Sequence, residues 1–181
     1  MNIMLDLETM DVGPNAAIIS IGAVMFSIDQ GVYNEFICNV DLESSIATGG
    51  TVNPQTVKWW LTQPFATRER VLKDAKTLEQ VLIAFSDWVS SDFGIITRFK
   101  TPAVWGNGSD FDCVILSTSF QRLGITRPWN YVGTRCYRTL KNIYPQTPFK
   151  REGISHNALC DARNQASYLI LLAKTYNLEL K

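Results

Sequence analysis

The chain has 181 residues, of which 46% are hydrophobic and 19% are charged, and this composition excludes a disordered chain. Lysine plus arginine and aspartate plus glutamate each number 17, so no overall positive field attracts nucleic acid, and any attraction has to be local. No apolar run reaches the roughly 18 residues of a membrane span, and the N-terminus lacks the basic segment of a signal peptide. We therefore expect a cytoplasmic protein without membrane contact, and the scattered cysteines are expected to be free thiols.

Three strands are predicted at the start of the chain. Residues 2–8 and 17–28 are predominantly apolar, and residues 32–40 alternate between apolar and polar positions. A turn signal at 29–31 (DQG) separates the last two of these segments. Because the connections are short, the three strands are expected to form an antiparallel meander.

The hydrophobic period then changes to that of helices. The clearest helix begins at Thr77, which fits a capping box with Gln80 and precedes a regular apolar face. Further helices are predicted at 54–63, 110–123, 135–144 and 158–176, with a short strand at 102–105. Strands followed by alternating helices and strands predict an α/β fold, in which helices flank a mixed sheet that is antiparallel first and then parallel. No linker divides the chain, so we expect a single domain over residues 1–181.

Two carboxylates interrupt the first apolar strand. Asp6 and Glu8 are two residues apart, so both side chains point to the same face of a strand. Two like charges at that distance repel each other unless solvent, an arginine or a metal ion lies between them. A lone Asp-x-Glu pair is most often a solvated outer face. Here Leu5 and Leu7 flank the pair and Thr9 follows it at the strand end, which favours a functional site.

Three further acidic residues and the single histidine occur where helices are expected to begin. Asp110 and Asp112 follow a glycine-rich turn, and Asp161 lies on the first turns of the final helix, five residues after His156. Each acid alone is explained by the favourable interaction of a negative charge with a helix N-terminus, and a lone histidine by a surface or capping role. Their combination with the paired carboxylates is more specific than any one of them.

Together these segments resemble the DEDDh (DnaQ-like) 3′–5′ exonucleases of the ribonuclease H-like superfamily. The resemblance covers nearly the whole chain and rests on LDLET at 5–9, WGNGSDFDCVIL at 105–116 and HNALCDARNQA at 156–166. The tryptophan pair at 59–60 and the WGNG segment are similar to the compact branch of phage and bacterial exonucleases and a bacterial exoribonuclease. The resemblance implies a ribonuclease H-like fold, a single exonuclease domain, and the cytoplasm of a bacterial or phage-infected cell.

The resemblance also implies a catalytic set and two Mg²⁺ or Mn²⁺ ions as cofactors. Hard divalent cations prefer oxygen ligands, which is the chemical reason for four carboxylates. Two such ions about 3.5–4 Å apart activate a water molecule as the nucleophile, neutralise charge on the phosphate and stabilise the leaving oxygen. Asp6 is expected to contact both ions, and Asp112 the second one. Glu8 and Asp161 are expected to hold the ion that activates water, and His156 to be the general base.

The second motif contains two aspartates, and the resemblance favours one of them. Asp112 follows Phe111 and precedes Ile115 and Leu116, as the family motif requires. Asp110 stands where this branch usually has a small polar residue. The metal ligand is therefore expected to be Asp112.

Residues near these motifs are candidates for substrate contact. Thr9 and Met10 follow the first motif and are expected near the terminal nucleotide, with Asn107 as a further candidate. Lys150 and Arg151 lie in the polar loop that leads to the third motif, where they can meet a phosphate. Solvated loop charges are an equally good interpretation of these two residues.

Trp59 and Trp60 invite a base-stacking interpretation. Adjacent residues on a helix point in different directions, so both rings cannot be core and both cannot form one stacking platform. We expect one tryptophan to pack and the other to stay open to substrate.

The predicted function is a metal-dependent 3′–5′ exonuclease that releases nucleoside monophosphates from single-stranded or 3′-overhanging DNA or RNA. Two alternatives stay open: an RNase H-type endonuclease, which shares the acids and the metals, and a nucleic-acid-binding module of the same fold without catalysis. A structural Ca²⁺ site is a third interpretation, but the sequence contains no EF-hand-type loop to support it. A homodimer is expected from the resemblance alone.

Overall fold

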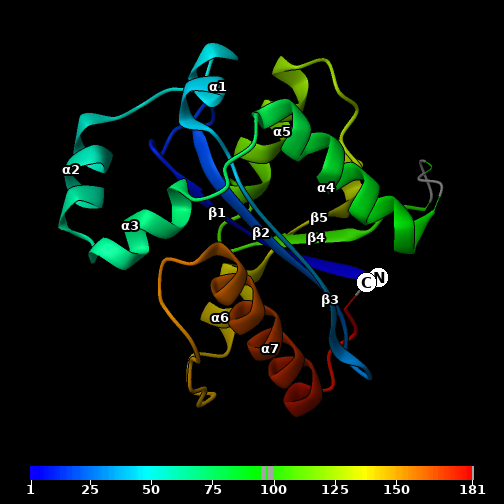
Figure 1. Ribbon diagram of the computed structural model, residues 1–181. Helices are drawn as coiled ribbons and strands as arrows, with labels where there is room; N and C mark the ends of the chain where they lie inside the picture. The colour runs from blue at the N-terminus through cyan, green and yellow to red at the C-terminus, as the bar shows by residue number, and fades with distance from the viewer. Residues whose placement is uncertain (95–96, 98–99, 181) are drawn as a thin grey trace.

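The computed structural model describes residues 1–94, 97 and 100–180, and its centre is a five-stranded sheet (Figure 1). The strand order is β3-β2-β1-β4-β5. The strands β1 (Asn2–Thr9), β2 (Ile18–Ser27) and β3 (Gly31–Asn39) are antiparallel neighbours. The strands β4 (Ala103–Gly106) and β5 (Thr134–Cys136) run parallel to β1. The predicted mixed sheet, antiparallel first and then parallel, is confirmed.

Helices cover both faces of this sheet. The helices are α1 (Leu42–Ala47), α2 (Pro54–Thr62), α3 (Phe65–Leu72), α4 (Leu78–Phe93), α5 (Asp112–Arg122), α6 (Tyr137–Ile143) and α7 (Ala158–Tyr176), with a 3₁₀ turn at Tyr131–Gly133. One apolar core lies between the sheet and α4 and α5, and a second lies between the sheet and α6 and α7 (Figure 1). In the part of the chain that the structure describes, no helix combines the length and apolar composition needed to cross a bilayer.

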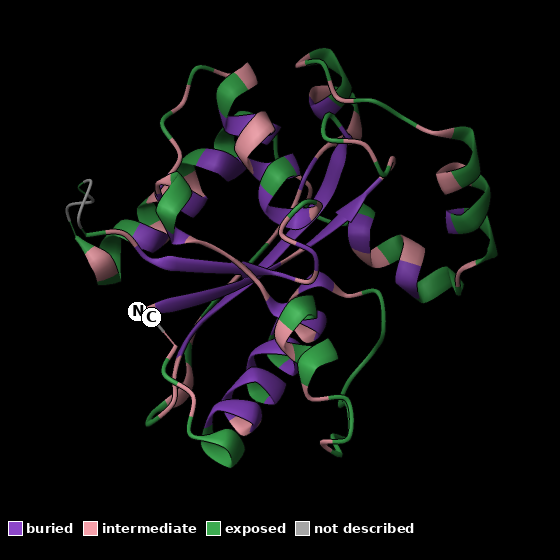
Figure 2. Cartoon of the chain, turned by 180° about the vertical axis from the view of Figure 1, so that it is seen from behind, coloured by how far each residue is buried: buried purple, intermediate pink, exposed green. Residues whose placement is uncertain are grey.

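The central strand β1 sends its side chains alternately to the two faces of the sheet. Ile3 and Leu5 belong to the core under α4 and α5, whereas Met4 belongs to the core under α7. Asp6 and Glu8 continue the row of Met4, so both carboxylates face α7, as the period of two requires. Figure 2 shows β1, β2 and β4 as buried along most of their length.

A glycine sets the distance between the sheet and α7. Gly22 lies opposite Asp6 in the ladder between β1 and β2. A Cβ atom at Gly22 would lie 2.2 Å from the carbonyl carbon of Ala158 and 2.3 Å from the backbone nitrogen of Leu159. Because position 22 has no side chain, α7 begins in direct contact with β2, and its first turn lies beside the Asp6 row.

The predicted elements are found with small differences at their ends. The capping box of Thr77 with Gln80 is present at the start of α4. The helix expected at 110–123 begins at Asp112, because the Phe111 N–H donates to the Gly108 carbonyl in a turn that precedes it.

Four short elements were not predicted from the sequence: β5, α1, α3 and the 3₁₀ turn at Tyr131–Gly133. Strand β5 occupies residues 134–136, so the helix expected at 135–144 begins only at Tyr137. Helices α1 and α3 were also missed, since they have six and eight residues and too few turns to show a regular apolar face. The side chain of Asp41 accepts a hydrogen bond from the Ser44 N–H at the start of α1, and this cap was the local signal.

Candidate active site

Four carboxylates that are far apart in the sequence gather where the parallel strands β1 and β4 end. Asp6 and Glu8 lie on β1, Asp112 begins α5, and Asp161 lies on the first turn of α7. Carboxylate oxygens of Asp6, Glu8 and Asp161 all lie within 4.8 Å of one another. The Oδ1 atom of Asp112 accepts a 3.2 Å hydrogen bond from the backbone N–H of Leu7, the residue between the paired carboxylates. We call these four acids the carboxylate cluster.

Of the two aspartates in the second motif, Asp112 reaches the cluster and Asp110 is exposed. The Oδ2 atom of Asp112 accepts a 2.9 Å hydrogen bond from the Asn107 N–H, so backbone amides hold both of its oxygens. A Cβ atom at Gly106 would lie 3.1 Å from that same Oδ2 atom. The glycine at the end of β4 therefore lets the first turn of α5 approach the strand closely.

Burial raises the pKa values of Asp6, Glu8 and Asp112, and repulsion between carboxylates adds to the rise for Asp6 and Glu8. Burial, followed by repulsion from Asp161 and Asp112, raises the pKa of Glu8 to about 8. Burial raises the pKa of Asp112 to about 7, against the lowering effect of the backbone hydrogen bonds that it accepts. The pKa of Asp6 is raised well above its ordinary value, first by burial and then by the other three carboxylates, while a hydrogen bond from Gln165 opposes the rise. A set of crowded oxygen donors that resist ionisation fits a hard divalent cation, whose charge would stabilise the ionised forms.

The two oxygens of Asp161 have partners in the loop that precedes α7. The Arg151 guanidinium forms an ion pair with Oδ1 of Asp161. The backbone N–H of His156 donates a 3.0 Å hydrogen bond to Oδ2 of the same carboxylate. Arg151 therefore supplies a positive charge to the carboxylate cluster in this structure.

His156 reaches the cluster through its backbone. Its φ angle is 58°, in the left-handed region that few residues other than glycine adopt. The exposed imidazole lies edge-on against the ring of Trp59, with 4.8 Å between ring centroids and an interplanar angle of 83°. The imidazole is thus at the rim of the site.

The two tryptophans of α2 have different surroundings. Trp60 is only 6% exposed, and its Nε1–H donates a 2.9 Å hydrogen bond to the Thr9 carbonyl at the end of β1. Trp59 is 40% exposed. Trp60 therefore packs and fixes the end of the first motif, and Trp59 is the ring that stays open.

Two separate hollows adjoin the carboxylate cluster. The first, which we call the α2 hollow, has a volume of about 400 Å³. Its lining includes Glu8 and Thr9 from the first motif and Trp59 from α2.

The second, which we call the α6–α7 hollow, has a volume of about 280 Å³, and its lining includes Asn107, Lys141, Phe149, Arg151 and Gln165. No residue lines both hollows among those that the structure describes.

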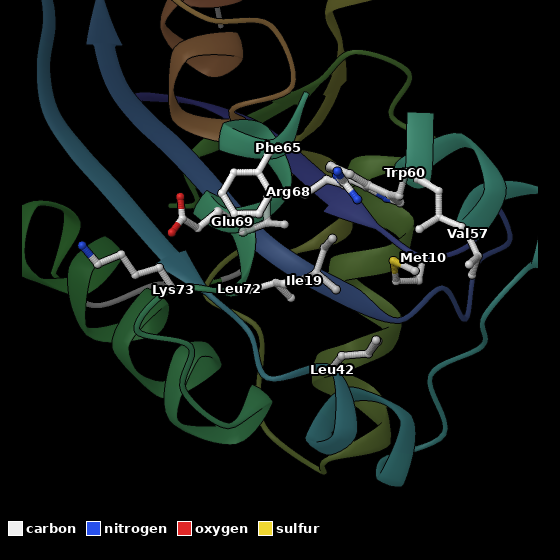
Figure 3. A pocket seen from close by; sticks show the side chains of 12 residues that line it. Met10, Ile19, Leu42, Val57, Trp60, Phe65, Arg68, Glu69, Leu72 and Lys73 are labelled. Carbon is white, nitrogen blue, oxygen red and sulfur yellow. The ribbon is translucent and has the colours of Figure 1, made fainter. Parts of the chain in front are cut away.

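Two residues expected at the substrate lie elsewhere. Met10 lines an apolar groove of about 640 Å³ that α2, α3 and β2 form (Figure 3). The β1–β2 register shifts between Glu8 and Thr9, just before Met10. Lys150 lines a hollow of about 580 Å³ beside the ion pair of Glu35 with Arg163. Of the expected substrate residues, the structure therefore brings Thr9, Asn107 and Arg151 to the site, and it does not bring Met10 or Lys150.

Two residues at the site were missed from the sequence. Gln165 donates a 2.7 Å hydrogen bond from Nε2 to Oδ1 of Asp6. Asn164 accepts a 2.8 Å hydrogen bond from the Glu152 N–H and donates a 2.7 Å bond to the Glu152 carbonyl, which holds the loop beside Arg151. Gln165 is four residues after Asp161 and therefore on the same helix face, and this spacing was the available signal.

The family model of the Rv2179c-like 3′–5′ exoribonuclease domain matches residues 1–172 of this chain. The chain belongs to this family. It is a 3′–5′ exonuclease that acts on nucleic acid, as its sequence motifs predicted. No curated protein sequence matches the chain.

Solved structures show that this chain shares a ribonuclease H-like exonuclease fold. The nuclease domain of 3′hExo, a DEDDh family member bound to rAMP, is 16% identical with a TM-score of 0.65, and the match covers 99% of this chain and 94% of that one. Exonuclease X in complex with 5′ overhanging duplex DNA is also 16% identical, with a TM-score of 0.60 and coverage of 99% and 95%. S. pombe Pop2p, in its Mg²⁺- and Mn²⁺-bound form, is 14% identical, with a TM-score of 0.56 and coverage of 97% and 83%.

Proposed function

We propose that the chain removes nucleotides one at a time from the 3′ end of RNA and releases nucleoside 5′-monophosphates, with two divalent cations as cofactors. The observation that carries this proposal is the gathering of Asp6, Glu8 and Asp161 oxygens within 4.8 Å, with Asp112 against the same strand. The family description and the relative that holds rAMP support RNA as the substrate, whereas Exonuclease X binds DNA. Single-stranded ends and 3′ overhangs are the expected forms, because the terminal nucleotide has to enter a hollow alone.

The carboxylate cluster is the proposed metal site. Asp6, Glu8 and Asp161 would hold one divalent cation, and Asp6 with Asp112 would hold the second. When bound, the ions supply positive charge that stabilises the phosphate oxygens and the leaving oxygen. The ion pair of Arg151 with Asp161 has to open for that carboxylate to become a ligand, which frees the guanidinium to meet a phosphate.

His156 is the proposed general base. Its imidazole takes a proton from the water that attacks the phosphorus; a new P–O bond forms, and the bond to the 3′ oxygen of the upstream nucleotide breaks. That oxygen takes a proton from solvent and leaves as the 3′ hydroxyl of the shortened strand, and the imidazolium returns its proton to solvent. The imidazole now lies against Trp59, so the proposal requires the loop to turn it toward the cluster when substrate arrives. The left-handed backbone of His156 supports such a role, because strained conformations concentrate at functional sites.

The proposed function is tested with 3′-labelled oligonucleotides of RNA and DNA, each single-stranded and with a 3′ overhang. In Mg²⁺ or Mn²⁺ we expect the labelled mononucleotide as the first product, faster from RNA than from DNA, and no product in EDTA. The Asp6→Asn variant is the inactive control, because it removes the carboxylate that both ions share.

Each alternative has its own outcome in that assay. Internal fragments as the first products would indicate an endonuclease. Binding of the oligonucleotides without any cleavage in Mn²⁺ would indicate a binding module. Equal rates on RNA and DNA would contradict the RNA preference while leaving the exonuclease activity intact. The homodimer and the cytoplasmic location expected from the sequence stay predictions, and light scattering in solution tests the first of them.

A further inference from the structure

The α6–α7 hollow contacts the carboxylate cluster through three of its lining residues. Gln165 hydrogen-bonds to Asp6, the Asn107 N–H hydrogen-bonds to Asp112, and Arg151 forms an ion pair with Asp161. The remaining carboxylate, Glu8, lines the α2 hollow. Asp6, Asp112 and Asp161 therefore adjoin the α6–α7 hollow, whereas Glu8 adjoins the α2 hollow.

The two hollows have opposite charge. The described lining of the α6–α7 hollow includes Lys141 and Arg151 and contains no acidic side chain. The described lining of the α2 hollow includes Glu8 and Asp11 and contains no lysine or arginine. At a 3′ end, the nucleoside beyond the scissile phosphate carries no further phosphate, whereas the strand on the 5′ side continues as a polyanion. Electrostatic complementarity therefore directs the continuing strand to the α6–α7 hollow.

The α6–α7 hollow also offers an aromatic surface and an unpartnered polar atom. The ring of Phe149 is 36% exposed and rests on Tyr168, with 5.0 Å between ring centroids. The Tyr168 hydroxyl donates to the carbonyls of Thr147 (3.1 Å) and Tyr144 (3.3 Å), which ties the segment before Phe149 to α7.

Gln165 supplies the unpartnered atom of this hollow. Its side chain is 8% exposed, and its Oε1 atom has no hydrogen-bond partner among the described residues. A buried acceptor without a donor costs free energy that a ligand can recover with a hydroxyl or amino group.

We propose that the α6–α7 hollow binds the nucleotide on the 5′ side of the scissile phosphate; this assignment rests on the proposed exonuclease function. Its base stacks on Phe149, and Lys141 contacts the next phosphate along the strand. Arg151, once released from Asp161, contacts a phosphate from the same side. A ribose hydroxyl or a base amino group of this nucleotide satisfies Oε1 of Gln165.

The test compares two substrates that differ only on the 5′ side. One is a uridine dinucleotide with a 5′ phosphate. The other is uridine 5′-(4-nitrophenyl phosphate), in which 4-nitrophenolate replaces the upstream nucleotide as the leaving group. We expect Phe149→Ala and Lys141→Ala each to lower kcat/KM on the dinucleotide by roughly tenfold, the scale of one lost base stack or charged contact. On the nitrophenyl ester we expect kcat/KM to change by less than about twofold.

Matched variants control for general effects. Phe65→Ala removes an exposed phenylalanine that lines the apolar groove, and Lys174→Ala removes a lysine from the last turn of α7; neither residue lines either hollow. Phe149→Leu keeps apolar packing on Tyr168 but removes the ring, so it should lose activity on the dinucleotide even if Phe149→Ala fails to fold.

Three outcomes would overturn the assignment. Equal losses on both substrates would place Phe149 and Lys141 at the 3′-terminal nucleotide instead. No loss on the dinucleotide would remove the hollow from substrate binding. A wild-type chain that cleaves neither substrate in Mn²⁺ would overturn the proposed function and this assignment with it.

Discussion

The candidate active site has two halves that are held in different ways. Asp6 and Asp112 belong to a half that strands fix: Asp6 pairs with Gly22 in the ladder, and Asp112 accepts hydrogen bonds from two backbone amides. Arg151 and His156 belong to an exposed loop in which His156 has a positive φ angle. The difference indicates a division of labour, in which the sheet half keeps metal ligands in place and the loop half carries the groups that have to move.

The largest effect is expected from His156. We expect His156→Asn to reduce turnover by ~10²–10⁴-fold, because it removes the proton acceptor. Asparagine tolerates the left-handed backbone, and its N–H can still donate to Asp161, so the affinity for Mn²⁺ should stay within about twofold of wild type. Single-turnover kinetics measure the first quantity and titration calorimetry the second. Full activity of the variant would remove His156 from the mechanism, and a matching loss of Mn²⁺ affinity would make its role structural.

The second-largest effect is expected from Gly22 and tests the sheet half of the site. We expect Gly22→Ala to destabilise the fold by roughly 2–3 kcal/mol or more, because the new Cβ atom would meet the backbone of Ala158 at 2.2 Å and the backbone cannot move away as a side chain can. Gly13→Ala is the matched control, since its Cβ atom would meet nothing closer than 3.9 Å. Thermal melts of both variants, with and without Mn²⁺, measure the effect. A Gly22→Ala variant as stable as Gly13→Ala would show that α7 does not depend on this contact.

The sequence predicted the sheet half of the site better than the loop half. Strand periodicity placed Asp6 and Glu8 on one face, and that face does meet α7. The partner of Asp161 depended on the path of a polar loop, so the ion pair with Arg151 had no local signal. The side chain of Met10 lines the apolar groove, and the register shift that precedes it has no periodic signature in the sequence.

Prediction of the secondary structure from the sequence was limited in the same way. The long strands and the helices of several turns were predicted from the sequence. The capping box of Thr77 gave the start of α4. Strand β5 has three residues, and its pairing with β4 comes from tertiary contact that no local pattern records. The choice between Trp59 and Trp60 likewise depended on which ring the end of β1 covers.

A smaller effect concerns the stability of the metal-free chain against pH. The pKa values of Glu8 and Asp112 are raised to about 8 and about 7, so the folded chain binds protons more tightly than the unfolded chain does. The contribution of these groups is therefore fully present below their ordinary pKa values of 4.5 and 3.8, and it is lost as the pH rises toward about 8. In EDTA we expect the melting temperature to fall between pH 5 and pH 8, by ~2–4 °C for each kcal/mol lost.

Two comparisons isolate the carboxylate cluster as the cause of that fall. Asp6→Asn removes one of the repelling charges and should flatten the pH dependence, whereas Asp110→Asn changes an exposed aspartate outside the cluster and should not. Saturating Mg²⁺ should also flatten it, because the cation stabilises the ionised acids. A metal-free wild-type chain whose melting temperature rises from pH 5 to pH 8 would contradict this account.

The smallest expected effect tests the loop half of the site, where Arg151 pairs with Asp161, a proposed metal ligand. We expect Arg151→Ala to raise the affinity for Mn²⁺ by ~3–10-fold, a modest range because the arginine side chain is 59% exposed and its ion pair is screened by solvent. Lys150→Ala is the matched control: it removes the same charge from the neighbouring residue, which lines a different hollow. Titration calorimetry of the two variants in one buffer distinguishes specific competition of Arg151 with the metal from a general effect of positive charge. An equal rise in both would assign the effect to net charge, and no rise in Arg151→Ala would mean that the guanidinium and the metal do not compete for Asp161.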